Sequence, residues 1–283
     1  MESYRPEGAT LTQPIHRPVL KWAGGKTKLM PFIRARFPRD DSRRWVEPFI
    51  GAGSVFLNMF VREGVLSDSN KDLINFYQCI QTNKVEFIDR VQLLAAKPFS
   101  EEDYYKLRAD FNASEDEMCR AVQFYALNRL GYNGLCRYNL DRQYSVPWGH
   151  RDKLNIDAAR IDYLSFRLSV IELKTCGFEG TLATAGEGDQ IYCDPPYDKI
   201  KKGSFVSYDG VPFDQNAHTR LADMLVGAHD KGATVAISNS KTPFTLELYE
   251  DRGFKIYEHN AYRSVGGSGR SRKKEEEILA VLI

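Results

Sequence analysis

The sequence has little cysteine, little histidine and no excess of either charge. Its 283 residues include five cysteines and five histidines, and no two cysteines are spaced as C-x-x-C. A disulfide scaffold and the common zinc-binding patterns are therefore excluded, and reduced thiols are favoured. The histidines show no metal-ligand spacing either, so we expect no metal cofactor.

Long hydrophobic runs are absent as well. No apolar stretch approaches the ~20 residues that cross a bilayer, and the first 20 residues hold three prolines and no apolar signal-peptide core. We therefore expect a soluble cytoplasmic protein with no membrane association. Residues 1–16 are expected to form a flexible N-terminal arm.

The balance of charge argues at first against a nucleic-acid partner. Lys and Arg total 39 against 38 for Asp and Glu, a net charge of +1, whereas nucleic-acid-binding domains are often strongly basic. The sum hides regional differences. Between residues 16 and 44 nine basic residues stand against two acids, and between 100 and 119 seven acids stand against two basic residues. We expect the basic segments to share one working face.

Strands and helices alternate at the two ends of the chain. This length suggests one large domain or two smaller ones, and a composition of 42% hydrophobic and 27% charged residues is that of a globular protein. The alternation predicts an α/β fold with a mostly parallel sheet that is covered on both faces. We expect strands at 44–48, 65–68, 169–175, 190–194, 233–238, 254–259 and 277–283, and helices at 53–63, 215–229 and 242–251.

The middle of the chain lacks strand candidates. Residues 131–150 are rich in Gly, Asn, Tyr and Arg, which is typical of an ordered loop or small hairpin. A helical block between the second and third strands predicts an inserted subdomain at 71–155, set into a domain made of 17–70 and 156–283. Helical periodicity covers 70–80, 84–95, 101–111 and 115–129.

A glycine turn follows the first strand. Gly51 and Gly53 lie just beyond it, and Asp68 ends the second strand. Glycines here let the backbone approach a ligand, and a carboxylate at the next strand end can accept hydrogen bonds from both ribose hydroxyls. An adenosine-containing ligand is indicated, with a tight turn and a helix cap as the alternative. Phe56 stands where a dinucleotide fold has its third glycine, which disfavours NAD.

Residues 24–27, Gly-Gly-Lys-Thr, resemble part of a phosphate-binding loop. That motif needs a further glycine at position 20, which is Leu20 here, so a nucleotide triphosphatase is excluded. Trp22 and Lys26 stay candidates for the rim of a ligand site, with a packing role as the alternative.

The run Asp194-Pro195-Pro196-Tyr197 follows the fourth strand. Two consecutive prolines cannot continue a β-ladder, so they fix an extended turn that projects Asp194 and Tyr197 from the carboxyl edge of the sheet. Asp194 and the Pro195 carbonyl can accept the two N–H bonds of an exocyclic amino group while Tyr197 stacks on its ring. The nitrogen lone pair is then directed at an electrophile, which predicts chemistry on an aromatic amine.

Eight short motifs occur along the chain in a fixed order. They are KWAGGK (21–26), VEPFIGAGSVFLN (46–58), LSDSNKDL (66–73), NRLGYNGLCRYN (128–139), VPWG (146–149), YCDPPY (192–197), ISN (237–239) and the tail SVGGSGRSRKKEEEILAVL. Together they resemble the Dam family of DNA adenine-N6 methyltransferases, from about residue 18 to the last residue.

The resemblance implies a seven-stranded Rossmann-like methyltransferase sheet with an inserted, mostly helical DNA-recognition subdomain. It also implies S-adenosylmethionine as cofactor. By the resemblance, the catalytic residues are Asp194, Pro195 and Tyr197, and the cofactor-binding residues are Trp22, Lys26, Phe49, Gly51, Gly53, Asp68 and Asp194.

Double-stranded DNA is the implied partner, with the target adenine flipped out of the duplex. GATC is the implied site because NRLGYNGLCRYN matches without a gap, while residues 140–145 depart from the family and leave altered specificity open. Arg137 is expected to contact guanine, and the basic segment 263–274 to contact phosphates. The implied DNA-binding residues are Lys21, Tyr132, Asn133, Leu135, Arg137, Pro147, Arg270, Arg272 and Lys273.

Other functions stay open. A non-catalytic DNA-binding regulator could keep this fold, and an RNA or protein methyltransferase could share the glycine turn. An NAD oxidoreductase would have no use for the Asp194–Tyr197 run. We expect a monomer, with a dimer on DNA as the alternative, in the cytoplasm of a bacterium or of a phage-infected cell.

Overall fold

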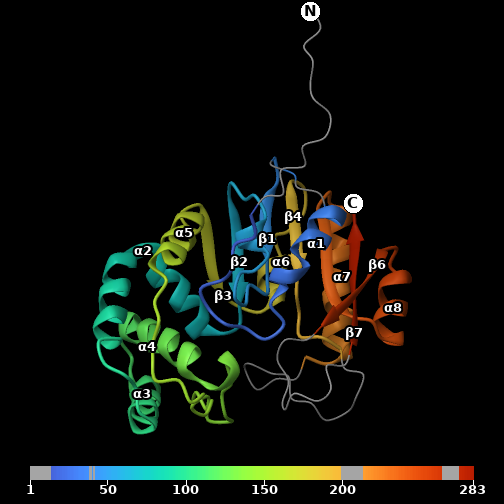
Figure 1. The fold of residues 1–283 in the computed structure, drawn as a ribbon. Helices are drawn as coiled ribbons and strands as arrows, with labels where there is room; N and C mark the ends of the chain where they lie inside the picture. The colour runs from blue at the N-terminus through green and yellow to red at the C-terminus, as the bar shows by residue number, and fades with distance from the viewer. Residues whose placement is uncertain (1–13, 38–39, 41, 199–212, 263–273) are drawn as a thin grey trace, which may run out of the picture.

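The computed structural model describes residues 14–37, 40, 42–198, 213–262 and 274–283. A seven-stranded sheet in the order β3-β2-β1-β4-β5-β7-β6 forms its centre, and β7 alone runs antiparallel to its neighbours (Figure 1). The expected Rossmann-like α/β fold class is thereby confirmed. The strands are β1 (Arg44–Glu47), β2 (Gly64–Asp68), β3 (Ile171–Thr175), β4 (Asp189–Cys193), β5 (Thr234–Ser240), β6 (Lys255–Tyr262) and β7 (Lys274–Leu282).

Side chains alternate between the two faces of the sheet, as strand geometry requires. Trp45 and Tyr192 enter one hydrophobic core, with α1, α2 and α5, while Val46 and Ile191 enter a second, with α6, α7 and α8. Both faces are therefore covered, as expected. The helices are α1 (Met30–Arg36), α2 (Lys71–Leu94), α3 (Glu101–Ala113), α4 (Glu117–Leu130), α5 (Ala158–Leu168), α6 (Phe178–Leu182), α7 (Gln215–Asp230) and α8 (Pro243–Glu250).

The helices α2, α3 and α4 follow one another between β2 and β3 and lie beside the sheet at its β3 end (Figure 1). The expected helices at 70–80 and 84–95 are both present as two segments of α2, and they meet at Asn83, where the backbone leaves helical geometry. Phe87 of α2, Tyr125 of α4 and Trp45 of the sheet belong to one continuous hydrophobic core. The division at 71 and 155 into two functional parts stays a prediction.

The expected helix at 53–63 is wrong, because the structure has only a 3₁₀ turn, η2 (Phe56–Asn58). Arg34 and Arg167, which lie far away in sequence, donate to the main-chain carbonyls of residues 56–59 at 2.7 to 2.9 Å. These carbonyls therefore do not need helical partners. Three helices were not expected from the sequence, namely α1, α5 and α6.

Residues 131–150 form the expected ordered hairpin. Antiparallel bridges join Gly131 to Trp148 and Tyr138 to Tyr144. The Tyr138 hydroxyl donates to Asp72 Oδ2 at 2.8 Å, which ties the hairpin to the start of α2. The start of the chain was expected to be a flexible arm, and its residues 1–13 lie outside the described residues.

Candidate active site

The candidate active site lies at the carboxyl edge of the sheet, at the point where the strand order reverses, with β2 and β3 on one side of β1 and β4 and β5 on the other. Strand β1 pairs with β2 on one side and with β4 on the other, and the chain leaves these strands at the same carboxyl edge. Ligands of open parallel sheets bind at such a switch point. The predicted Gly51, Asp68 and Asp194 all follow or end one of these three strands.

The glycine turn after β1 is in close contact with Trp22 and Tyr77. Gly51 and Gly53 have φ of +47° and +74°, in the left-handed region that favours glycine. A Cβ on Gly51 would lie 3.0 Å from Trp22 Nε1, so the indole stands directly against the turn. The Tyr77 hydroxyl donates to Gly51 O at 2.7 Å and fixes the same turn from α2. Nothing in the sequence pointed to Tyr77.

Asp68 joins the glycine turn to the start of α2. Its carboxylate accepts from Gly51 N at 3.2 Å and from Asn70 N at 3.0 Å. The side chain that caps α2 is Asn70, which accepts from the main chain of residues 72 and 73. The alternative in which Asp68 serves as the helix cap is thus wrong.

Asp194 forms an ion pair with Lys26. Lys26 Nζ lies 2.9 Å from Asp194 Oδ2, donates to Gly24 O at 2.6 Å and sits 4.7 Å from the centre of the Tyr197 ring. Lys26 is buried, whereas the Asp194 side chain keeps 23% of its surface exposed. Burial raises the pKa of the Asp194 carboxyl, and the charge of Lys26 opposes that rise.

The turn that carries Asp194 is tied to strands beyond β4. Pro195 is buried, and the Tyr197 hydroxyl donates to Glu277 Oε2 of β7 at 3.1 Å. Asp198 N donates to Asn239 Oδ1 of β5 at 3.1 Å. Sequence reasoning assigned no role to Glu277 or Asn239, although both lie in the tail and ISN motifs.

Phe49 is the predicted cofactor residue that faces the other core. Its ring packs on Phe178 and Phe213, each with ring centres 5.8 Å apart. Trp22 and Gly51 lie with the first core or against it. At the same carboxyl edge the residues form two groups of contacts, and Phe49 packs with the second core. The first group is Trp22, Gly51, Gly53 and Asp68, and the second is Lys26, Asp194 and Tyr197.

Lys21 connects this site to the predicted target loop. Its main-chain N donates to Asn128 Oδ1 at 2.9 Å, and its Nζ donates to Arg129 O at 3.1 Å. Gly134 packs on its aliphatic part so closely that a Cβ there would lie 2.4 Å from Lys21 Cβ. Burial, Arg151 and Arg129 lower the pKa of Lys21 to about 8.

The target loop itself presents exposed groups on a rigid turn. Tyr132 is 45% exposed, and Asn133 adopts a φ of +53° within the 3₁₀ turn η3 (Tyr132–Gly134). Tyr132 N donates to Pro147 O at 2.9 Å, while Leu135 is half-buried. Arg137 is exposed and donates to Ser145 Oγ and O at 3.3 and 3.2 Å.

The basic residues between 16 and 44 do not share one face, so that expectation is wrong. Lys21 and Lys26 reach the carboxyl edge, whereas Arg44 starts β1 at the amino edge and pairs with Asp189 at 2.8 Å. Arg34 also lies at the amino edge, where its side chain donates to Asn58 O. The segment includes α1 and crosses between the two edges, which separates its charges. The predicted Arg270, Arg272 and Lys273 lie outside the described residues.

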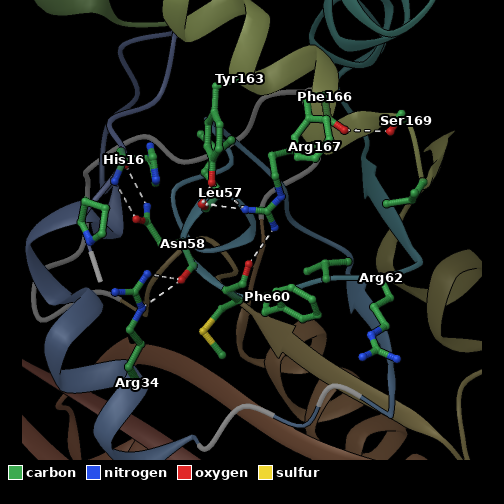
Figure 2. A pocket seen from close by; sticks show the side chains of 14 residues that line it. His16, Arg34, Leu57, Asn58, Phe60, Arg62, Tyr163, Phe166, Arg167 and Ser169 are labelled. Carbon is green, nitrogen blue, oxygen red and sulfur yellow. Dashed lines mark hydrogen bonds between the residues drawn. The ribbon is translucent and has the colours of Figure 1, made fainter. Parts of the chain in front are cut away.

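A cavity of about 470 Å³ lies at the amino edge, away from the predicted residues. Figure 2 shows Arg34 and Arg167 directed at the 57–58 loop that forms part of its wall. His16 closes another side, where its N donates to Asn58 Oδ1 at 2.8 Å and its ring stacks on Tyr163. The guanidinium groups of Arg34 and Arg167 are used to bind this loop, and we take the carboxyl edge as the candidate site.

Two further findings concern metals and membranes. Among the described residues, His, Cys, Asp and Glu side chains form no group of three or more that could hold a metal ion. No helix of the described ranges has both the length and the apolar character that crossing a membrane requires. The expected absence of a metal cofactor stays a prediction.

Comparison with known proteins agrees with the motifs. The family model of the D12 class N6 adenine-specific DNA methyltransferases matches residues 22–265. The chain is 35% identical to DNA adenine methylase of Escherichia coli K12 over 268 residues, covering 94% of this chain and 95% of that protein. It is 34% identical to DNA adenine methylase of Haemophilus influenzae over 282 residues, covering 98% of each.

A phage protein is similar as well. The DNA N-6-adenine-methyltransferase of Escherichia phage P1 is 35% identical over 269 residues, which are 94% of this chain and 35% of that protein. With a family model across most of the chain and relatives aligned over nearly their whole length, the chain belongs to the D12 class N6 adenine-specific DNA methyltransferase family.

Proposed function

We propose that this adenine-N6 DNA methyltransferase transfers the methyl group of S-adenosylmethionine to an adenine that is flipped out of duplex DNA, at the site GATC. The observation that supports this most is the ion-paired Asp194 at the strand switch point, with the Tyr197 ring and the glycine turn beside it. Substrate amine and methyl donor would thus meet at one edge.

The residues present fit an adenosine-containing donor. Gly51 lines a cradle that any side chain would fill, since a Cβ there already meets Trp22. Asp68, at the end of β2, is the acceptor for the ribose hydroxyls, with Trp22, Lys26, Phe49 and Gly53 around the rest. When bound, S-adenosylmethionine supplies an electrophilic methyl group.

The protein's own groups prepare the amine. The Asp194 carboxylate and the Pro195 carbonyl accept the two N–H bonds of the adenine amino group, which reduces conjugation of its lone pair with the ring. Tyr197 stacks on the base and offsets part of the cost of unstacking it. Lys26 favours the ionised form of Asp194 against the effect of burial.

Recognition falls to the hairpin and the segment tied to it. Tyr132, Asn133 and Leu135 fill and read the space beside the flipped base. Arg137 donates to guanine, and a bidentate contact of this kind contributes about 1–3 kcal/mol of discrimination. Lys21 is hydrogen-bonded to the end of α4, just before the hairpin, and contacts the site from the cofactor side. Pro147, Arg270, Arg272 and Lys273 complete the DNA-binding set.

The cellular setting follows from the substrate. We place the protein in the cytoplasm, where bacterial and phage DNA is found, as a monomer that needs no metal. The opposing candidates are a non-catalytic DNA-binding regulator and an RNA methyltransferase.

The test compares two aspartates at opposite ends of β4. Asp194→Asn removes a carboxylate that is paired with Lys26 at 2.9 Å, and Asp189→Asn removes one that is paired with Arg44 at 2.8 Å. We expect Asp194→Asn to lower tritiated-methyl transfer to plasmid DNA by about 1,000-fold. Asp189→Asn should lose only stability. Equal activity of both folded variants would refute the role of Asp194.

The target is tested on the same plasmid. We expect wild-type treatment to protect every GATC site from a methylation-sensitive endonuclease, with no effect of competitor RNA. If methyl groups were incorporated while GATC sites stayed unprotected, the proposed methyltransferase activity would stand and the proposed recognition sequence would be wrong. If competitor RNA suppressed DNA methylation and was itself methylated, the RNA methyltransferase would be favoured. DNA binding without any methyl transfer would favour the regulator.

A further inference from the structure

The turn after β4 has few main-chain groups by which it can be held. Pro195 and Pro196 carry no N–H, so neither can donate to a neighbouring strand. Asp198 N is therefore an important tie, and it donates to Asn239 Oδ1 at 3.1 Å. Asp198 lies directly after Tyr197, so whatever fixes Asp198 constrains the aromatic ring before it.

Asn239 is fixed at both ends of its amide. It lies in β5 with 0% of its surface exposed. Its Oδ1 accepts from Asp198 N and from Ser240 N, at 3.1 and 2.9 Å. Its Nδ2 donates to the Tyr249 hydroxyl at 3.0 Å and lies 3.3 Å from His218 Nδ1.

His218 suits the acceptor role toward Asn239. Burial lowers the pKa of His218 to about 4, so the ring is neutral at pH 7 and can present a lone pair at Nδ1. The two acidic groups that favour its protonation, Asp198 and Asp214, do not outweigh burial. The amide oxygen of Asn239 is thus turned toward the active-site turn, and its nitrogen toward the core.

A second contact holds the Asp198 side chain. Thr242 Oγ1 donates to Asp198 Oδ2 at 2.7 Å, and Thr242 also caps the start of α8. Asn239 therefore holds the main chain of Asp198, and Thr242 holds its carboxylate. On the other side, Glu277 pairs with Ser240 across β5 and β7 and accepts from the Tyr197 hydroxyl.

We propose that Asn239 is a positioning residue for methyl transfer: by holding Asp198 it sets the plane of the Tyr197 ring and the direction of the Asp194 carboxylate. The inference rests on the proposed roles of Asp194 and Tyr197. Asn239 is fully buried behind the turn and keeps the Tyr197 ring in place for stacking, so we expect its loss to slow the chemical step far more than it weakens DNA binding.

The test separates the chemical step from binding. We expect Asn239→Ala to lower the single-turnover methylation rate by about 10- to 100-fold, as a misplacement of about 1 Å does. Its Kd for GATC duplex should stay within about twofold of the wild type. Asn239→Asp keeps an acceptor for Asp198 N but replaces the donor to Tyr249 and His218 with a buried charge, so it should recover only part of the rate.

The matched control is Asn58, a second buried asparagine with hydrogen bonds to the main chain, at the opposite edge of the sheet. Asn58→Ala should lower the melting temperature without changing the single-turnover rate. If Asn239→Ala fails to fold, Thr242→Val against Thr242→Ser tests the same grip, and the valine variant should be the slow one.

The outcomes distinguish this inference from the proposed function. Wild-type single-turnover rates in folded Asn239→Ala and in Thr242→Val, with Asp194→Asn inactive, would overturn the positioning role alone. Full activity of Asp194→Asn would overturn the proposed function itself. A rate loss in Asn239→Ala that Asn58→Ala shows equally would also count against positioning.

Discussion

The two edges of the sheet use ion pairs in opposite ways. At the amino edge Arg44 pairs with Asp189, and at the carboxyl edge Lys26 pairs with Asp194, at nearly equal distances. The hydrogen bond to Asp189 raises the pKa of Arg44, so its charged form is stabilised. Burial raises the pKa of Asp194, so its charged form is destabilised despite its partner.

The difference supports our proposal that the amino edge serves folding and the carboxyl edge serves chemistry. The amino edge places Arg34 and Arg167 on carbonyls that have no helical partner, and each such bond adds to stability. The carboxyl edge keeps a carboxylate under conditions that disfavour it. Groups held in this way are typical of functional sites.

After the loss of Asp194 itself, the largest effect is expected when the cation of each ion pair is removed. We expect Lys26→Met to lower kcat at pH 7 by about 100-fold, or about 2.7 kcal/mol, while Arg44→Met lowers the melting temperature alone. Without Lys26 the pKa of Asp194 rises further. Because the reaction needs the ionised carboxylate, kcat falls as pH drops through that pKa.

The acid limb of the kcat profile should therefore move to higher pH in Lys26→Met, as stopped reactions from pH 5 to 9 would measure. An unmoved limb would mean that Asp194 does not titrate in the reaction.

An intermediate effect is expected at two glycines with positive φ. Gly51→Ala and Gly188→Ala should each lose about 1 kcal/mol of unfolding free energy in denaturant titrations, because both adopt left-handed backbone (φ of +47° and +78°). A Cβ at Gly51 meets Trp22, whereas one at Gly188 has nothing within 4 Å.

We accordingly expect about a tenfold rise in KM for S-adenosylmethionine in Gly51→Ala and none in Gly188→Ala. Equal KM values for the two variants would remove the glycine turn from the cofactor site.

The smallest expected effect is at Lys21, the residue of the carboxyl edge that we propose contacts DNA. Lys21 has a pKa of about 8, so it loses its charge as pH rises from 7 to 9. We expect affinity for GATC duplex to fall about fivefold over that range, as one charged contact is lost. Lys21→Arg stays charged, so its affinity should be flatter with pH in anisotropy titrations. Parallel curves would exclude Lys21 from the DNA contacts.

Much of the fold was predictable because its determinants are local. Strand positions follow from short apolar runs such as that around Ile191, bounded by turn residues, and each strand was predicted to within a few residues. The 53–63 helix was mispredicted because Arg34 and Arg167 take the carbonyls of that segment from 24 to 111 residues away. No local pattern reports such a partner.

The site divides in the same way. That Gly51, Asp68, Asp194 and Tyr197 lie at one edge was predictable because each ends or follows a parallel strand, and all such ends meet there, while their roles stay a prediction. The presence of Glu277 at this edge was not predictable, since it lies in the first half of its strand, β7. It reaches the same edge only because β7 runs antiparallel, which places it opposite Ser240.

The place of β7 has a consequence for synthesis of the protein. This strand follows β6 in the chain, yet it lies between β5 and β6 in the sheet. While the chain emerges from a ribosome, β6 has no strand to pair with until β7 has been made. The acceptor for the Tyr197 hydroxyl arrives with that same strand, so the edge at which we propose the base binds is completed late, after the nascent chain has passed residue 277.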